Sequence, residues 1–310
     1  MRGLALLSLL AVLGTLAACS SSDETRTRIP AIPEYNSFLG ASEFVVGENR
    51  FPFALASLEG QFLENAEVMV DFFVFREGIG EFKFRLPAQF REAVGVTPHI
   101  HEDGEIHEHL DVRGIYVVDS AGFDSPGIWS AQFSITSAEG QHPTAGELAF
   151  NVLLEPAAPG VGELVPASHN LTVHDVDSIE EIDTHIPPDD MHDLSVAEAL
   201  QEGKPLVVAW STPMFCVSQI CGPVLDEVIK VQDQYGDRVN FIHIEPWDLK
   251  VARSEGRLVA IPEFAEWELP SEPWVFVIDG TGRVAARYEG LVTHEELEVA
   301  VREVLDRSAP

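Results

Sequence analysis

Short apolar runs, many of them alternating with polar residues, fill the chain from Glu43 to Leu154. Turn residues of the types Gly, Pro, Asn and Asp separate these runs, and no stretch between them has a helical period. Each run therefore predicts a strand, and together they predict an all-β domain. The runs are 43–47, 50–57, 67–75, 81–86, 114–119, 127–135 and 146–154.

The number and spacing of these strands favour an immunoglobulin-like sandwich, to which we assign residues 38–155. The chain then becomes rich in Pro, Gly and Ala over 155–170, which is typical of a domain boundary. An acidic stretch follows, interrupted by Pro187 and Pro188. We expect residues 156–193 to be an ordered but irregular linker that leads into a second domain.

From Ser195 onward, helical and strand patterns alternate. The segment 195–203 predicts a helix with a Ser N-cap and a Gly just after its end. Continuous apolar runs at 204–210 and 238–245 predict buried strands. The amphipathic stretch 223–236, between them, predicts a second helix.

The end of the chain completes this second domain. Residues 273–290 predict two strands around a turn at Asp279, and the sequence Asp-Gly-Thr-Gly there is that of a hairpin and not of a protease site. Thr293 and Glu296 form a capping box that opens a closing helix. The order of elements predicts a compact α/β domain over residues 194–310.

The first residues have the pattern of an export signal. Arg2 precedes an apolar run from Leu4 to Leu13, which is too short to be a stable membrane span. The segment Leu-Ala-Ala-Cys that ends at Cys19 resembles the lipobox of bacterial lipoproteins, in which cleavage precedes a cysteine that becomes lipidated. The alternative is an ordinary signal peptide with a chance cysteine.

This resemblance implies a location for the protein. Residues 1–18 would be the signal peptide, and residues 19–37, which are polar after Cys19, would be a lipidated, flexible tether. The chain would then be exported and anchored by lipid to the outer face of the bacterial cell membrane, or be periplasmic. Disulfides persist in such a compartment.

The charge of the chain is strongly negative. Asp and Glu number 51 against 19 Lys and Arg, which gives a formal net charge of −32. Such a surface repels nucleic acid and anionic lipid headgroups, so neither is an expected partner of the folded domains. The acidic residues are spread along the chain, which is typical of a solvated surface.

Two of the three cysteines, Cys216 and Cys221, lie five residues apart. If Cys19 carries lipid, they can pair only with each other or with a partner. In a regular helix their Cα atoms would be ~7.5 Å apart along the axis, beyond the ~6.8 Å that a disulfide permits. A bonded pair therefore needs Cys216 in the loop before the helix, or both cysteines ahead of a helix opened by Pro223. In either case the positive helix end would lower the pKa of the Cys216 thiol.

The order of elements, with a cysteine pair just after the first strand, resembles the thioredoxin fold over residues 195–308. The strand through Trp210, the sequence Gly-Pro-Val-Leu-Asp-Glu with Pro223, and the loop with Pro273 carry the likeness. The resemblance implies thiol–disulfide exchange with a protein partner. Cys216 would attack, Cys221 would resolve, and Pro273, as a cis-proline, would shape the groove for the partner chain.

Two departures limit the resemblance. The cysteine spacing is Cys-x-x-x-x-Cys, where thioredoxin has Cys-x-x-Cys, and Val208 stands where thioredoxin has a buried acid. The whole arrangement also resembles bacterial lipoproteins that join an N-terminal β domain to a thioredoxin-like domain. For the cysteines, a redox pair, a structural disulfide and a copper or other soft-metal site with two thiolates all stay open.

Four histidines, at 99, 101, 107 and 109, flank Asp103 and Gly104 in two alternating pairs. A three-residue loop would pair His101 with His107 and His99 with His109, and four imidazoles would converge as a copper or zinc site. A two-residue Asp-Gly turn would divide them between two faces, but it would also separate Ile100 from Ile106. We favour the odd loop.

These histidines support the alternative function, a non-enzymatic metal-binding or accessory lipoprotein whose cysteines form a structural disulfide. An exposed polar hairpin tip would give the same pattern. Six further histidines lack such spacing, and nothing in the sequence motivates a catalytic role for His185 or His192. These six are His142, His169, His174, His185, His192 and His243.

Overall fold

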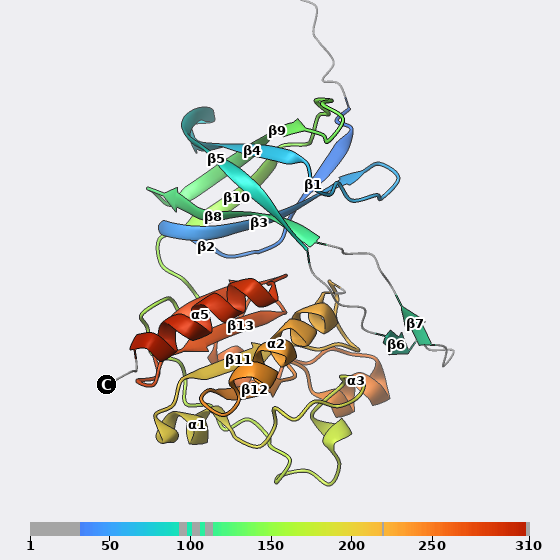
Figure 1. The fold of residues 1–310 in the computed structure, drawn as a ribbon, viewed down its shortest axis with the longest axis vertical. Helices are drawn as coiled ribbons and strands as arrows, with labels where there is room; N and C mark the ends of the chain where they lie inside the picture. Colours follow the sequence, from blue (N-terminus) through green and yellow to red (C-terminus); the bar gives the residue numbers. More distant parts are fainter. Residues whose placement is uncertain (1–31, 93–97, 101–105, 109–113, 219, 308–310) are drawn as a thin grey trace, which may run out of the picture. The chain divides into compact units, whose positions relative to one another are not determined.

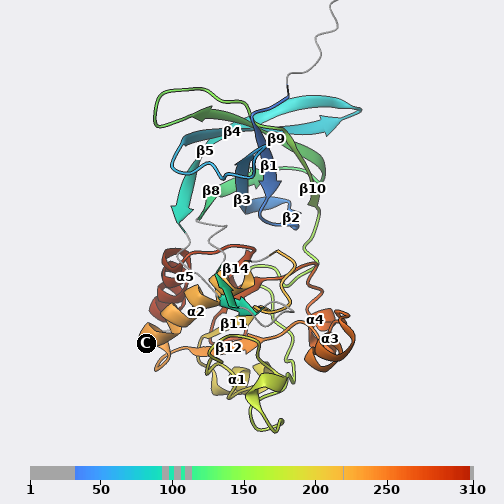
Figure 2. The same cartoon turned by 90° about the vertical axis from the view of Figure 1, so that its right-hand side faces the viewer.

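The structure is a computed structural model that describes residues 32–92, 98–100, 106–108, 114–218 and 220–307. The described residues from Pro33 onward cluster into one unit by their contacts. An eight-stranded sheet and a four-stranded sheet organise it (Figures 1 and 2). Among the residues described, no helix is long and apolar enough to cross a membrane.

The eight-stranded sheet contains every strand that the N-terminal pattern predicts, and also β1, which it does not. The order is β1-β3-β8-β5-β4-β9-β10-β2. Neighbours are antiparallel except β2 and β10, which are parallel. The strands are β1 Tyr35–Leu39, β2 Phe44–Val45, β3 Gly47–Ser57, β4 Glu67–Arg76, β5 Ile79–Glu92, β8 Gly114–Phe123, β9 Gly127–Thr136 and β10 Leu148–Leu153; β6 Pro98–Ile100 and β7 Ile106–Glu108 form a separate two-stranded sheet.

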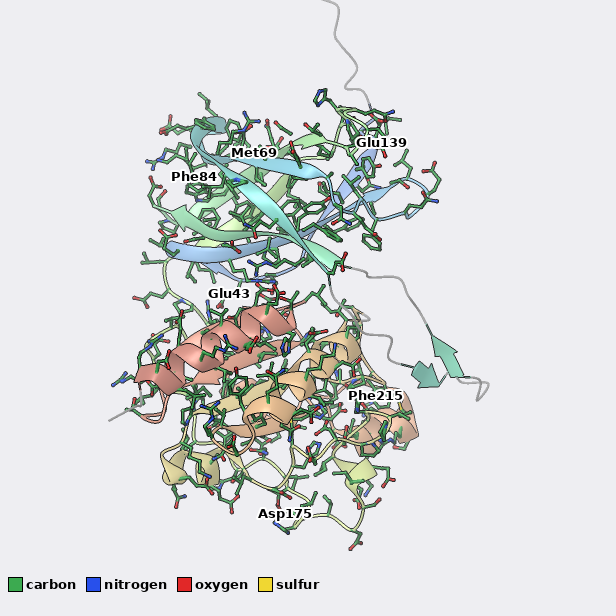
Figure 3. All side chains as sticks on the ribbon, viewed as in Figure 1. Glu43, Met69, Phe84, Glu139, Asp175 and Phe215 are labelled. Atoms are coloured by element: carbon green, nitrogen blue, oxygen red, sulfur yellow. A yellow bond between two sulfur atoms is a disulfide. The ribbon has the colours of Figure 1, made fainter. Side chains whose placement is uncertain are left out.

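The predicted immunoglobulin-like sandwich is not confirmed, because these strands form one continuous sheet instead of two stacked ones. The long strand β5 is the reason: residues 79–88 pair with β4, and residues 89–92 pair with β8. Aromatic side chains from both halves of the sheet share one core, which requires the sheet to curl. In that core Phe84, labelled in Figure 3, packs on Phe72 with ring centroids 4.9 Å apart.

The four-stranded sheet has the order β12-β11-β13-β14, with β11 parallel to β12 and the other neighbours antiparallel. This topology, with a helix after β11 and a hairpin and helix at the end, is thioredoxin-like, as the resemblance implies. The strands are β11 Leu206–Trp210, β12 Asn240–Ile244, β13 Trp274–Ile278 and β14 Val284–Glu289; the helices are α1 Val196–Glu202, α2 Cys221–Tyr235, α3 Leu249–Glu255, α4 Pro262–Glu266 and α5 His294–Arg307.

Alternation along β11 divides the core of this domain in two. Val207 and Ala209 pack under α2 and α5, which lie side by side in Figure 1. Val208 and its neighbours at 206 and 210 pack on the opposite face with α1 and α4. Successive residues of a strand point to opposite faces, so a run that is apolar throughout must be covered on both.

The predicted ends of α1 are also confirmed. Ser195 accepts a hydrogen bond from the Glu198 amide, and Gly203 ends α1 in the left-handed region at φ 68°. Helix α2 begins at Cys221, two residues before the predicted start at Pro223. The short helices α3 and α4, of seven and five residues, were not predicted.

The segment 156–193 has little regular structure. Its only regular element is the single turn η1 at Ile179–Glu181. Ala158 and Val165 pack into one core of the α/β domain and Met191 into the other. The Met191 carbonyl accepts a hydrogen bond from the His243 amide on β12, which fixes the end of the segment against the sheet edge. The boundaries at 155 and 193 stay predictions.

Candidate active site

A disulfide joins Cys216 to Cys221, with Cα atoms 5.9 Å apart. Strand β11 ends at Trp210, a loop carries Cys216, and Cys221 is the first residue of α2. This is the first of the two geometries that the five-residue spacing allows. Phe215, labelled in Figure 3, comes immediately before the bonded Cys216. Cys221 is fully buried, whereas Cys216 is half-buried, so the two sulfurs differ in their access to a partner.

The loop is held by hydrogen bonds around both cysteines. The Cys221 amide donates to Sγ of Cys216 at 3.2 Å, and Oγ of Ser218 lies 3.3 Å from the same sulfur. The Ser211 hydroxyl donates to the Cys221 carbonyl at 2.9 Å. Amides at a helix N-terminus have no partner within the helix and carry the positive end of its dipole. A thiolate at Cys216 would be stabilised by these free amides and by the positive end of the dipole.

Opposite the cysteines, the peptide bond between Glu272 and Pro273 is cis, as predicted. Oε1 of Glu272 accepts a hydrogen bond from the Val217 amide at 3.4 Å. One carboxylate oxygen of Glu272 and the two cysteine sulfurs all lie within 4.8 Å of one another. Burial raises the pKa of the Glu272 carboxyl, against the opposing effect of the Val217 amide.

The sequence did not identify Glu272, although a carboxylate directly before the predicted cis-proline was a visible signal. The sequence did identify the loss of thioredoxin's buried acid. Val208 is completely buried in the core between the sheet and α1, so no proton acceptor stands at that position. Glu272 reaches the sulfurs from the other side of the loop and supplies a carboxylate there.

A second group of ionisable side chains lies behind the same loop. It consists of Asp183, Asp189, His192 and His243, and one ligand atom from each falls within 4.8 Å of the others. Burial lowers the pKa of His243, but the nearby carboxylates, above all that of Asp189, outweigh it and raise this pKa to about 10. Burial correspondingly raises the pKa of Asp189, and the two imidazoles lower it by more.

Hydrogen bonds connect this buried group to the cysteine loop. Nε2 of His243 donates to the Ser211 carbonyl at 3.1 Å, one residue after β11. The Thr184 hydroxyl accepts from the Met214 amide at 3.1 Å, two residues before Cys216. The loop therefore rests on side chains from residues 183–192 and from β12.

The spacing of the histidines along the sequence did not identify His192 and His243 as members of one group. His243 and Glu245 are polar residues within and next to the apolar strand β12, and a buried polar group there needs a partner. Residues 183–192 contain several Asp and His side chains. Neither pattern shows, on the sequence alone, that the two segments meet.

The predicted histidine hairpin is described only in its backbone. His99 pairs with His107 and Ile100 with Ile106. This register differs by two residues from the predicted pairing of His101 with His107 and of His99 with His109, and the predicted loop at 103–105 lies outside the described residues. His101, His109 and Cys19 lie outside the described residues, as do the side chains of His99 and His107. The four-histidine metal site and the lipidation stay predictions.

No protein-family model matches the chain, and no match was found among curated proteins. One similar solved structure is described as a thioredoxin-like superfamily protein. It shares 20% identity over 39% of this chain and 91% of that chain, with a TM-score of 0.29. Another is a thiol:disulfide interchange protein of the thioredoxin family from Chlorobium tepidum TLS, with 18% identity over 48% of this chain and 99% of that chain and a TM-score of 0.31. The thioredoxin-like fold itself follows from the strand order and directions given above.

Proposed function

We propose that this protein exchanges thiols and disulfides with a protein partner through Cys216 and Cys221, outside the cytoplasmic membrane to which it is anchored. The observation that carries the proposal is the placement of the bonded pair. A half-exposed sulfur is joined to a buried one at the N-terminus of a 15-residue helix, beside a carboxylate and a cis-proline. Structural disulfides need none of these neighbours.

The two cysteines have different roles in this proposal. In the reduced pair, the Cys216 thiolate attacks a disulfide of the partner, forms a mixed disulfide and releases one partner thiolate. Cys221 then attacks Sγ of Cys216, which closes the intramolecular disulfide and releases the second partner thiol. Two electrons pass from the pair to the partner, and the same steps in reverse oxidise a dithiol partner. Because Cys216 is the accessible sulfur, it is the one that meets the partner.

Glu272 handles the proton of the resolving step. Cys221 is buried, so its thiol cannot lose a proton directly to water before it attacks. The Glu272 carboxylate lies within 4.8 Å of both sulfurs and can accept that proton. A carboxyl whose pKa is raised by burial is a better base at neutral pH than an ordinary one. Glu272 thus supplies, from a different part of the chain, the carboxylate that is missing at Val208.

The location outside the membrane is supported by the N-terminal sequence. The apolar segment and the Leu-Ala-Ala-Cys sequence ending at Cys19 favour export and lipidation, and a polar tether follows. A lipid at Cys19 would leave Cys216 and Cys221 as the only thiols of the chain. The partner would then be another exported or membrane-exposed protein with a disulfide or dithiol.

A mixed-disulfide trap tests the function. The full-length protein with Cys221→Ser is expressed in cells, and disulfide-linked adducts are separated on non-reducing gels and identified by mass spectrometry. We expect discrete adducts that disappear on reduction, because the mixed disulfide at Cys216 can no longer be resolved. Cys216→Ser is the matched control and should give no adducts. Equal adducts from both variants, or none from Cys221→Ser, would contradict the proposed roles.

A further inference from the structure

We propose that Asp183, Asp189, His192 and His243 bind one divalent transition-metal ion, for which Zn²⁺ is the best match. The proposal does not depend on the exchange chemistry of Cys216 and Cys221. It also concerns a site distinct from the histidine hairpin at residues 98–108.

The distances among the four side chains suit a single ion. Nδ1 of His243 lies 2.8 Å from Oδ2 of Asp189 and 3.7 Å from Oδ1 of Asp183. Nε2 of His192 lies 3.2 Å from Oδ1 of Asp189 and 3.5 Å from Oδ2 of Asp183. Ligand atoms around a tetrahedral ion with bonds of about 2.0 Å are about 3.3 Å apart. Small rotations of the side chains would bring four ligand atoms to that spacing.

One nitrogen in this group lacks a hydrogen bond. Nε2 of His192 is buried and faces both carboxylates, but neither contact has hydrogen-bond geometry. The His192 side chain is only 1% exposed, so water does not compensate. A buried polar atom without a partner is costly, and a ring nitrogen directed between two carboxylates has the position of a metal ligand.

The surrounding hydrogen bonds orient the ligands. Nε2 of His243 donates to the Ser211 carbonyl, which fixes that proton and directs Nδ1 toward the carboxylates. The Asp183 carboxylate accepts from the amides of His185 and Asp189, and Oδ1 of Asp189 accepts from the Met191 amide. Metal-binding histidines and carboxylates are commonly held by such second-shell contacts.

Charge balance is compatible with an ion at this position. The Asp183 and Asp189 side chains are 0% and 2% exposed, and two buried carboxylates need positive charge close by. A divalent ion supplies two positive charges when it replaces the protons of the imidazoles, which bind a metal in their neutral form. Two imidazoles with two carboxylates suit Zn²⁺, whereas Mg²⁺ and Ca²⁺ prefer oxygen ligands alone.

A cavity lies beside this site. It has a volume of about 900 Å³ and is lined in part by His192, His243 and Glu245. Oε2 of Glu245 is buried without a hydrogen-bond partner, while its Oε1 accepts from the Thr184 amide. Because Ser211 and Met214 are bonded to His243 and Thr184, a bound ion would fix the base of the cysteine loop.

Zinc binding by the oxidised, full-length protein tests the site. The protein is stripped with a chelator, and binding of Zn²⁺ is measured by competition with a chromogenic chelator and by metal analysis. The four hairpin histidines at 99, 101, 107 and 109 are first replaced by Ala, so that the hairpin contributes no histidine ligands. We expect one Zn²⁺ per chain, a higher unfolding temperature with Zn²⁺ but not with Mg²⁺, and nitrogen and oxygen ligands by X-ray absorption.

Matched variants in the same background then assign the ligands. Asp189→Asn and His243→Gln should each lower the affinity for Zn²⁺ more than about 100-fold, since loss of a second-shell contact alone costs 10–100-fold. His142→Gln, at an exposed histidine of the β-rich region, should leave the affinity unchanged. No Zn²⁺ bound by the four-histidine background, or unchanged affinity in both ligand variants, overturns the proposal. If the ligand variants do not fold, the stoichiometry and the Zn²⁺-dependent unfolding temperature of the background decide.

Discussion

The thioredoxin-like domain has two chemically distinct regions that meet at one loop. The cysteine pair is covalent, partly exposed and built by six consecutive residues that start at Cys216. The Asp and His group is electrostatic, almost fully buried and built by residues as far apart as Asp183 and His243. The exposed region can react with a macromolecule, whereas the buried one can only hold the fold or a small ion. We therefore expect mutations to separate exchange activity from stability.

The largest expected effect is on exchange. Cys216→Ser should lower the rate of reduction of a disulfide substrate by more than about 10³-fold, as loss of a covalent nucleophile does. Its unfolding transition, compared with that of the reduced wild type, should change little because Cys216 lies outside the two cores of its domain. Stopped-flow exchange kinetics measure the first and urea denaturation the second. Normal exchange by this variant would contradict the assignment of exchange activity to the cysteine pair.

The second effect is on stability. Asp189→Asn in chelator-treated, oxidised protein should lower the free energy of unfolding by about 3–5 kcal/mol, because it leaves buried partners uncompensated. Urea denaturation gives the value. Glu255→Gln is the control: Glu255 pairs with Arg257 at the surface, with both side chains more than half exposed, and the urea midpoint should not change. An equal, small effect of both variants would show that the buried group does not hold the fold.

The third effect concerns Glu272, for which we expect a change in exchange rate and a change in stability. Glu272→Gln should slow resolution of the mixed disulfide about 10²-fold, the usual contribution of a positioned proton acceptor. The rate at which the partner thiol is released is measured from pH 5 to 8. In the variant, the part of its pH dependence that comes from ionisation of the Glu272 carboxyl should disappear. A Gln variant with the wild-type rate and pH profile would leave Glu272 without a role in proton transfer.

Glu272 also predicts a pH dependence of stability in the oxidised protein. Burial raises its pKa above the ordinary 4.5, so the neutral carboxyl is favoured in the fold. The stability that it contributes is complete below its unfolded pKa and is lost as pH rises through the folded pKa. Glu272→Gln should remove this loss and flatten the stability curve just above pH 4.5, as measured by urea denaturation at several pH values. A curve with unchanged slope would contradict the burial of the carboxyl.

The smallest effect should be separate from both regions. Ser195→Ala removes the hydroxyl that caps α1 and should cost about 1 kcal/mol of unfolding free energy. Exchange rate and metal affinity should stay as in the wild type, since the structure describes no hydrogen bond or ion pair between α1 and the cysteines or the Asp and His group. If this variant lost exchange activity or metal affinity, a general loss of stability would be enough to impair the two sites.

Local signals in the sequence predicted much of this domain. Ser195, Gly203 and the capping box of Thr293 act within one turn of chain, and the apolar strands at 206–210 and 274–278 need only be buried to be recognised. The cysteine pair was recognisable for the same reason, because five residues limit where the two sulfurs can meet.

Tertiary contacts account for the features that the sequence did not predict. Nothing near His243 indicates that Asp183 and Asp189 pack against it, because their meeting depends on how residues 156–193 cross the sheet edge. The curl of the eight-stranded sheet depends on β5 changing its partner from β4 to β8. Residue alternation identifies the faces of a strand but not its neighbours.

The reduction potential of the Cys216–Cys221 pair decides whether this disulfide can exchange with a partner. Purified oxidised protein is equilibrated with glutathione or dithiothreitol buffers, and the thiol content is determined by alkylation and mass spectrometry. We expect a potential between about −120 and −270 mV, the range of catalytic pairs. A value below about −300 mV would show a structural disulfide and contradict the proposed exchange.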